Sequence, residues 1–275
     1  MPESHGAGPR LDSVEIKMTF SAAQAAAAAE ALAPGDGGIR RHVHFCEAPP
    51  RGRGPGTPAL LDGGVILRLR ADAGHGRGDG DATVKLRPCR RARLSRRWLR
   101  FREEDGDTLR LEEDWSAGNA GHAENRVLAA SLTSDCGRPA VDAVTSGANP
   151  LRTVFSRRQR AFLAECADVR VDFRTLRVLG PVRAVRWHGV RLNHHELTLE
   201  RWSFAASAAE SAGPGPGEEP LDWLEISERV APDGAEVVQA SLQALVRGLG
   251  LEPDLKQETK TRRVLETLLR ARPAT

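Results

Sequence analysis

The chain has 275 residues, of which 40% are hydrophobic and 28% are charged, a composition typical of a globular protein rather than of a disordered or membrane protein. Lys and Arg number 40 against 37 Asp and Glu, so the net charge of +3 predicts no general polyanion-binding surface. The 4 cysteines lie far apart without a C-x-x-C pair, which argues against a zinc module or disulfide framework. No signal peptide or membrane span is recognisable, and we expect a cytoplasmic protein with reduced thiols.

The first half of the sequence predicts mainly strands after a flexible leader over residues 1–12. Residues 14–20 alternate strictly between apolar and polar side chains, which indicates a strand, and an alanine-rich helix is expected over 21–33. Further strands are expected at 40–45, 65–70, 83–87, 99–104 and 108–115. Glycine-, proline- and aspartate-rich segments predict loop insertions near 49–58, 71–81, 105–125 and 205–220.

The second half predicts a mixture of helices and strands. Helices are expected over 135–146, 156–166, 236–249 and 259–271, with Ser156 as an N-cap. Strands are expected over 182–190, 196–204 and 222–229. The strands do not alternate regularly with helices, which argues against βαβ units. We therefore expect an antiparallel α+β fold, with a single domain over residues 13–272.

Several predicted strands give one face to ionised side chains of both signs, spaced two residues apart. The clearest pairs are Glu15 with Lys17, Arg68 with Arg70, and Lys85 with Arg87. For any single strand, a solvent-exposed face is the simpler interpretation. Repetition across strands instead favours a wide barrel with a polar interior. Guanidinium and ammonium groups there would match phosphate oxygens, and the carboxylates beside them would require a bridging divalent cation.

Three other patterns allow competing interpretations. Histidines at 42 and 44, and at 194 and 195, are candidate metal ligands, but neither pair has a third ligand near it in the sequence. The basic run over 90–100 includes Trp98 and could bind single-stranded nucleic acid. A solvated surface explains that run more simply, so nucleic acid is not an expected partner. The scattered tryptophans are expected to pack in the core or the barrel wall.

Short motifs follow one another along the chain in a fixed order. They are V-E-I-K at 14–17, G-V-I-L-R-L-R at 64–70, T-V-K-L-R at 83–87, L-E-I-S at 224–227 and Q-E-T-K-T at 257–261. In this order they resemble the CYTH domain of the triphosphate tunnel metalloenzymes, in an actinobacterial-like branch. Members of that superfamily include class IV adenylate cyclases, thiamine triphosphatases and inorganic triphosphatases. The resemblance extends from Val14 to about Leu269.

The resemblance implies an eight-stranded antiparallel β-barrel that forms a tunnel with flanking helices. Basic residues would bind a triphosphate and carboxylates would bind Mg²⁺ or Mn²⁺. The implied phosphate-binding residues, with Arg40 added by strand parity, are Lys17, Arg40, Arg68, Arg70, Lys85, Arg87, Arg186 and Lys260. The implied metal-binding residues are Glu15, Glu200, Glu225 and Glu103. Glu15 and Lys85 are the candidate catalytic residues.

The function implied by the resemblance is metal-dependent hydrolysis of a linear triphosphate, with inorganic tripolyphosphate as the first substrate to consider. Thiamine triphosphate hydrolysis and cyclisation of ATP to cyclic AMP are alternatives. Ser13 stands where the family motif has its first glutamate, which removes one potential metal ligand. That departure keeps open a third alternative, a module that binds polyphosphate or nucleotide without turnover. The sequence gives no indication of the oligomeric state.

Overall fold

The computed structural model describes residues 10–21, 23–49, 56–74, 78–116, 126–204, 221–254 and 260–270. Its strands are β1 Ser13–Ser21, β2 Ile39–Glu47, β3 Val65–Asp72, β4 Gly80–Leu86, β5 Glu103–Glu104, β6 Asp107–Ser116, β7 Arg126–Asp135, β8 Arg177–Leu192, β9 His195–Phe204 and β10 Leu221–Val230. Its α-helices are α1 Ala23–Leu32, α2 Ala59–Asp62, α3 Arg96–Arg100, α4 Arg138–Thr145, α5 Arg157–Cys166, α6 Ala235–Gly248 and α7 Lys260–Arg270.

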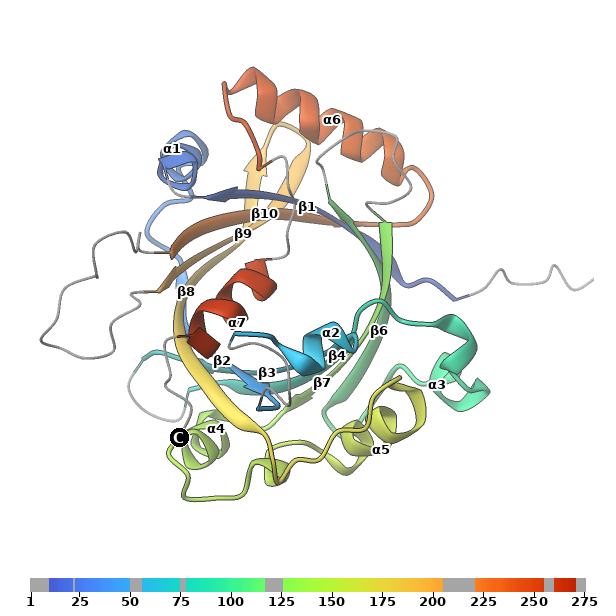
Figure 1. The fold of residues 1–275 in the computed structure, drawn as a ribbon. Helices are drawn as coiled ribbons and strands as arrows, with labels where there is room; N and C mark the ends of the chain where they lie inside the picture. Colours follow the sequence, from blue (N-terminus) through green and yellow to red (C-terminus); the bar gives the residue numbers. More distant parts are fainter. Residues whose placement is uncertain are drawn as a thin grey trace, which may run out of the picture.

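The strands form one sheet that closes on itself, as the view down the barrel in Figure 1 shows. The order is β1-β10-β9-β8-β2-β3-β4-β7-β6-β5, and β1 also pairs with β6. Nine strands therefore form the ring, and the two-residue β5 lies outside it. The β1–β6 pair is parallel and the other pairs are antiparallel.

The predicted α+β barrel with flanking helices is confirmed, but the prediction of eight antiparallel strands is wrong. An odd number of strands cannot close a ring in which every neighbour is antiparallel. The ninth strand therefore requires a parallel pair, and β1 and β6 form it, with Ser13 opposite Glu112 in the register. This pairing places the start of β1 beside the acidic end of β6.

Two secondary-structure predictions fail in the segment between residues 99 and 135. The strand expected over 99–104 is wrong, because α3 occupies Arg96–Arg100 and β5 spans only two residues. β7, Arg126–Asp135, was predicted as no element at all. Its middle consists of small residues, Ala129, Ala130 and Ser131, whose weak apolar contrast hides the two-residue period of a strand.

Helices α1, α3, α4, α5 and α6 cover the outside of the barrel (Figure 1), and the strands beneath them pack their apolar faces against these helices. One cluster joins the outer faces of β3, β4, β6 and β7 to α3, α4 and α5, with Trp98 and Phe162 fully buried. A second cluster joins β1, β9 and β10 to α1 and α6. On the strands of these two clusters the outer face is apolar, so the alternation turns the polar side chains inward.

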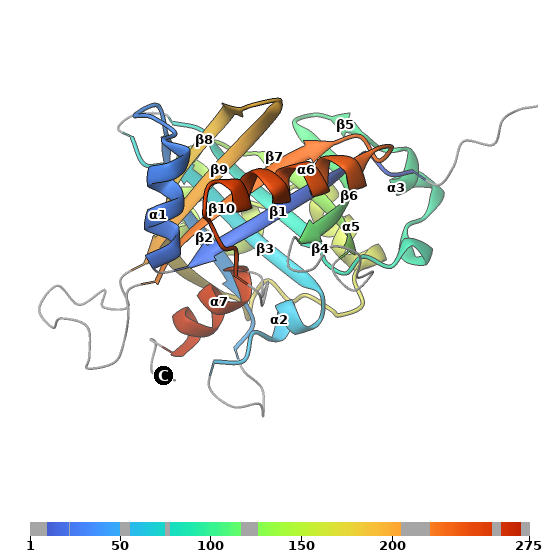
Figure 2. The ribbon, with the colours of Figure 1, turned by 90° about the horizontal axis from the view of Figure 1, so that it is seen from above.

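One end of the barrel is filled by α7. Val264, Leu265 and Leu268 of this helix pack in a third cluster with Phe45 and Trp202 of the strands. The two views in Figures 1 and 2 place α7, together with α2, within the ring and at one end of it. The amphipathic α7 thus buries its apolar face inside one mouth of the barrel.

Several expected loops lie partly or wholly outside the described residues. These include residues 1–9 of the predicted leader, 50–55, 75–77, 117–125 and the whole of 205–220. Arg10, from the end of the predicted leader, donates hydrogen bonds to the carbonyls of Phe101 and Leu109. The insertion expected near 105–125 contains β6, which is part of the barrel wall. None of the described helices has both the length and the apolar character needed to cross a membrane.

A buried glutamine fixes α5 to the barrel. Ser156 caps the helix as predicted, and its hydroxyl accepts a hydrogen bond from the Gln159 backbone N–H at 3.0 Å. The Gln159 side-chain Nε2 donates to the carbonyls of Ala82 at 2.7 Å and Leu132 at 2.9 Å. These bonds tie the helix to β4 and β7.

We expect Gln159→Met to lower the free energy of unfolding by about 1–3 kcal/mol, because it leaves buried carbonyls without their donor. Urea denaturation would measure the change. Arg157→Met, at an exposed position of the same helix, is the matched control and should change the free energy by less than about 0.5 kcal/mol. Equal stability of both variants would contradict the role assigned to Gln159.

Candidate active site

The interior of the barrel contains a cavity of about 410 Å³ lined almost entirely by polar and charged side chains. They come from eight strands of the ring and from the start of α7. The cationic side chains are Lys17, Arg68, Arg70, Lys85, Arg87, Arg110, Arg186, Arg229 and Lys260. The carboxylates are Glu15, Glu112, Asp114, Glu200 and Glu225. The cations outnumber the carboxylates by four, so the local excess of positive charge is larger than the net charge of the whole chain.

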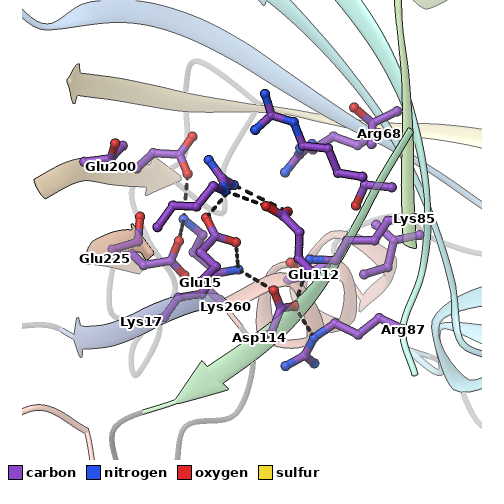
Figure 3. Close-up of a pocket in the computed structure, with 18 of the residues that line it drawn as sticks. Glu15, Lys17, Arg68, Lys85, Arg87, Glu112, Asp114, Glu200, Glu225 and Lys260 are labelled. Atoms are coloured by element: carbon purple, nitrogen blue, oxygen red, sulfur yellow. Dashed lines mark hydrogen bonds and ion pairs between the residues drawn. The ribbon is translucent and has the colours of Figure 1, made fainter. Parts of the chain in front are cut away.

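Asp114 is the centre of one ion-pair cluster in this tunnel (Figure 3). Its carboxylate lies 2.8 Å from Lys85 Nζ, 2.7 Å from Arg87 Nε and 3.3 Å from Lys17 Nζ. Burial alone would raise the pKa of Asp114, but Lys17, Lys85 and Arg87 outweigh it and hold the pKa well below its usual range. Asp114 is therefore ionised and fixes three cations in place.

Glu15 extends this cluster. Its carboxylate lies 2.7 Å from Lys17 Nζ and 3.2 Å from an Arg229 guanidinium nitrogen. Burial opposes ionisation of Glu15, but Lys17, Lys85 and Arg229 lower its pKa to about 2. The side chain is therefore negatively charged throughout the neutral range.

Glu112 lies where the parallel β1–β6 pair brings the two strands together. Ser13 Oγ donates a hydrogen bond of 2.6 Å to Glu112, and Arg229 Nε donates one of 2.5 Å. The family motif has a glutamate at the position of Ser13, and here the carboxylate comes instead from the neighbouring strand. The departure at Ser13 thus does not leave this part of the tunnel without an acidic group.

Lys260 forms a second ion-pair cluster with carboxylates of the neighbouring strands β9 and β10. Its ammonium lies 2.8 Å from Glu200 and 3.0 Å from Glu225, and 4.3 Å from the ring centroid of Trp202. Burial opposes ionisation of Glu200, but Lys260 and Arg186 hold its pKa well below the usual range. Glu200 and Glu225 are paired directly across β9 and β10, so their carboxylates lie side by side.

Two buried guanidinium groups have unsatisfied donors. Nε of Arg68 and Nε of Arg186 are inaccessible to solvent and have no hydrogen-bond partner. Burial and the neighbouring Arg70 lower the pKa of Arg68 to about 10, so it remains charged at neutral pH. Unpaired buried donors are costly and uncommon, so these two groups point to an anionic partner from outside the chain.

Most residues predicted from the sequence meet in this tunnel. Those that line it are Glu15, Lys17, Arg68, Arg70, Lys85, Arg87, Arg186, Glu200, Glu225 and Lys260. Arg40 does not line it: the residue, exposed on β2, is next to Arg41, which pairs with Asp72 on the inner face. The prediction therefore assigned the wrong set of alternate β2 residues to the inner face of the barrel. Glu103 does not line it either, because it is exposed on β5, outside the ring.

Four charged residues of the tunnel are not among those predicted from the sequence. They are Arg110, Glu112 and Asp114 of β6 and Arg229 of β10. A signal was present in β6, where Leu109 and Leu111 alternate with Arg110 and Glu112 as in the other strands. Arg229 follows Glu225 and Ser227 at the same two-residue period.

The carboxylates fit a divalent cation whose coordination shell is completed by the substrate. No three His, Cys, Asp or Glu side chains of the described residues form a preformed metal cage. Mg²⁺, however, usually takes one or two carboxylates and fills its shell with water and substrate phosphates, and Mn²⁺ accepts the same oxygen ligands. Glu200 and Glu225 have the chemistry and the adjacency for this role.

The histidine pair at 194 and 195 lies away from the tunnel. His195 Nδ1 is 2.6 Å from a Glu228 carboxylate oxygen, and both histidine rings lie about 3 Å from the hydroxyl of Ser241 on α6. These contacts join α6 to β9 and β10. No described histidine belongs to a group of side chains able to hold a metal ion.

Comparison with solved structures bears on the fold. HpAC1 from Hippeastrum, described as an adenylyl cyclase candidate with a dominant triphosphatase activity, matches with a TM-score of 0.53 and 14% identity over 90% of this chain and 93% of that chain. The chain has the triphosphate tunnel fold. The resemblance predicted from the sequence motifs is thereby confirmed at the level of the fold.

Two further solved structures match with lower TM-scores: PH1819 from Pyrococcus horikoshii and an adenylate cyclase candidate from Vibrio parahaemolyticus. PH1819 has a TM-score of 0.41 and 12% identity over 90% of this chain and 97% of that chain. The Vibrio protein has a TM-score of 0.37 and 10% identity over 91% and 97%. The sequence matches no family model and no curated protein.

We expect the double variant Arg68→Met, Arg186→Met to lose at least about 100-fold in affinity for tripolyphosphate, because each charged donor contributes about 1.5–3 kcal/mol. Calorimetric titration in EDTA would measure binding without turnover. Circular dichroism should show that the variant folds, since neither Nε donor has a hydrogen-bond partner in the protein.

Arg201→Met is the matched control for this double variant. Arg201 is on the opposite face of β9 from Glu200 and pairs with Asp222 at 2.6 Å. Its replacement removes a charge without touching the tunnel, so the affinity should change by less than about twofold. An unchanged affinity in the double variant would refute anion binding by the two buried guanidinium groups.

Proposed function

We propose that the chain hydrolyses linear triphosphates inside the tunnel in a metal-dependent reaction, with inorganic tripolyphosphate as its preferred substrate. The observation that carries this proposal is the pair of buried guanidinium donors, on Arg68 and Arg186, without a partner in the protein. They belong to the cavity inside the barrel, whose cations outnumber its carboxylates. A compact, highly charged anion satisfies both the unpaired donors and the charge excess.

The substrate would be held by cations from one arc of the tunnel wall. Arg68 and Arg70 on β3, Lys85 on β4 and Arg186 on β8 line the cavity from strands that lie close together in the ring, and Arg87 directly follows β4. Their side chains are restrained by burial and by ion pairs such as Arg70 with Asp81 at 3.0 Å. Such fixed donors can stabilise charge on a transferring phosphoryl group without reorganising.

Glu200 and Glu225 are the residues that would hold the divalent cation. When bound there, Mg²⁺ or Mn²⁺ would neutralise phosphate charge and orient water for attack. Glu15, on the strand next to β10, contributes fixed negative charge near Lys17 and Lys85.

In the proposed reaction, a water oxygen attacks the terminal phosphorus in line with the bond to the leaving pyrophosphate. The new P–O bond forms as the anhydride bond breaks, which yields orthophosphate and pyrophosphate. Glu15, with a pKa of about 2, is a poor proton acceptor at neutral pH, so its role is electrostatic. Burial and Lys17 lower the pKa of Lys85, which makes it a better proton donor to the leaving oxygen than an ordinary lysine.

Cyclisation of ATP is less well supported than hydrolysis. A nucleobase is commonly held by stacking on an aromatic side chain. The residues that line the described part of the tunnel include no Phe or Trp. The cavity therefore favours a substrate that consists of phosphates over one with a large aromatic group inside the barrel.

We expect malachite-green assays to show orthophosphate release from tripolyphosphate with Mg²⁺ or Mn²⁺ and none in EDTA. Glu225→Gln keeps the shape of the side chain but removes its charge, so kcat should fall about 100-fold. Asp222→Asn, on the opposite face of the same strand, is the matched control and should keep the wild-type rate.

The reaction products distinguish triphosphate hydrolysis from the alternative functions. Pyrophosphate from ATP together with cyclic AMP would establish a cyclase, and a preference for thiamine triphosphate would change the substrate. Tight binding of tripolyphosphate without any release of phosphate would contradict hydrolysis and establish a binding module.

A further inference from the structure

Lys260 differs from the other cations of the tunnel in its origin. The others that pair with carboxylates, such as Lys17 and Arg229, belong to the barrel wall. Lys260 is instead the first residue of α7, the helix that fills one mouth of the barrel. Its ammonium is therefore brought to Glu200 and Glu225 by an element that is separate from the sheet (Figure 3).

The Lys260 ammonium occupies the position that suits a divalent cation. It lies between two carboxylates of adjacent strands, at 2.8 Å and 3.0 Å, and its side chain is only 7% exposed. The face of the Trp202 ring, 4.3 Å away, adds a further attraction for a cation at this point. An ammonium and a divalent cation cannot share the same pair of oxygens.

We propose that Lys260 is a built-in counter-ion of the Glu200–Glu225 pair and makes cation binding conditional on the triphosphate. This inference rests on the function proposed above. A phosphate oxygen of the substrate attracts the Lys260 ammonium and releases the two carboxylates, which then accept the divalent cation. Without the anion, the ammonium keeps the cation out.

The same contacts make the dependence mutual. A cation at Glu200 and Glu225 frees Lys260 to bind phosphate, so each ligand raises the affinity of the other by the same factor. The tunnel would therefore load both ligands together, and a divalent cation alone would bind weakly. This coupling prevents the metal ion from binding when no substrate is present.

The test is a titration of the protein with Mn²⁺ alone, in which the electron paramagnetic resonance signal reports the concentration of free Mn²⁺. This measurement does not require turnover. Lys260→Met removes the ammonium and keeps the length of the side chain, so Mn²⁺ affinity should rise at least about tenfold over wild type. Arg262→Met is the matched control: Arg262 lies on the same helix and pairs with Asp62 at 2.8 Å. It should leave Mn²⁺ affinity unchanged.

Adding Glu200→Gln and Glu225→Gln to Lys260→Met locates the cation, because the gained affinity should then be lost. Equal or weaker Mn²⁺ binding by Lys260→Met would overturn the proposal, provided that circular dichroism shows a folded protein. If that variant does not fold, tryptophan fluorescence of the wild-type protein tests the proposal. Its Trp202 emission should shift when Mn²⁺ and non-hydrolysable imidotriphosphate are added together, and no shift beyond that of Trp202→Phe would overturn the proposal.

This outcome is separable from the proposed hydrolysis. Phosphate release by the wild type with no gain of Mn²⁺ affinity in Lys260→Met would leave the hydrolase standing and remove the counter-ion role. A gain of Mn²⁺ affinity without any phosphate release would support the counter-ion role in a protein that binds without turnover.

Discussion

The structure depends on one constraint: charged side chains on the inside of a closed barrel are removed from bulk water and must be neutralised by one another. Each carboxylate of the described tunnel lies within 3.3 Å of a cationic nitrogen. Isolated buried charges of this kind would cost several kcal/mol each. The alternation of the strands sets this inner layer, and the outer helices exist to cover the apolar faces left on the other side.

The ion pairs form networks, and this shapes how substitutions act. Asp114 bonds with three cations, so its loss would leave Lys17, Lys85 and Arg87 close together without a counter-ion. Removal of one of those cations instead leaves the carboxylate with two partners. The effect of a substitution thus depends on which member of the network is removed, and effects at neighbouring positions do not add.

The sequence predicts the inner faces better than the closure of the barrel. Glu15 and Lys17, or Arg68 and Arg70, lie two residues apart on strands with clear apolar alternation, and local periodicity is enough to place them. The count of strands, the parallel β1–β6 pair and the proximity of Ser13 to Glu112 depend on contacts about 100 residues apart. No local pattern encodes such pairings, which is why a missing acid on one strand could not be matched to an acid on another.

The apolar outer face and the charged inner face of the barrel make different contributions to stability and ligand binding. Packing of the outer clusters sets most of the stability, because it removes apolar area from water. The inner face carries the unpaired donors of Arg68 and Arg186, which reduce stability in the absence of a ligand. Such a cost is typical of a functional site, where fixed groups are kept ready for a partner that the chain itself does not supply. Replacement of these two arginines should therefore change ligand preference with little effect on folding, whereas substitutions in the outer clusters act on stability first.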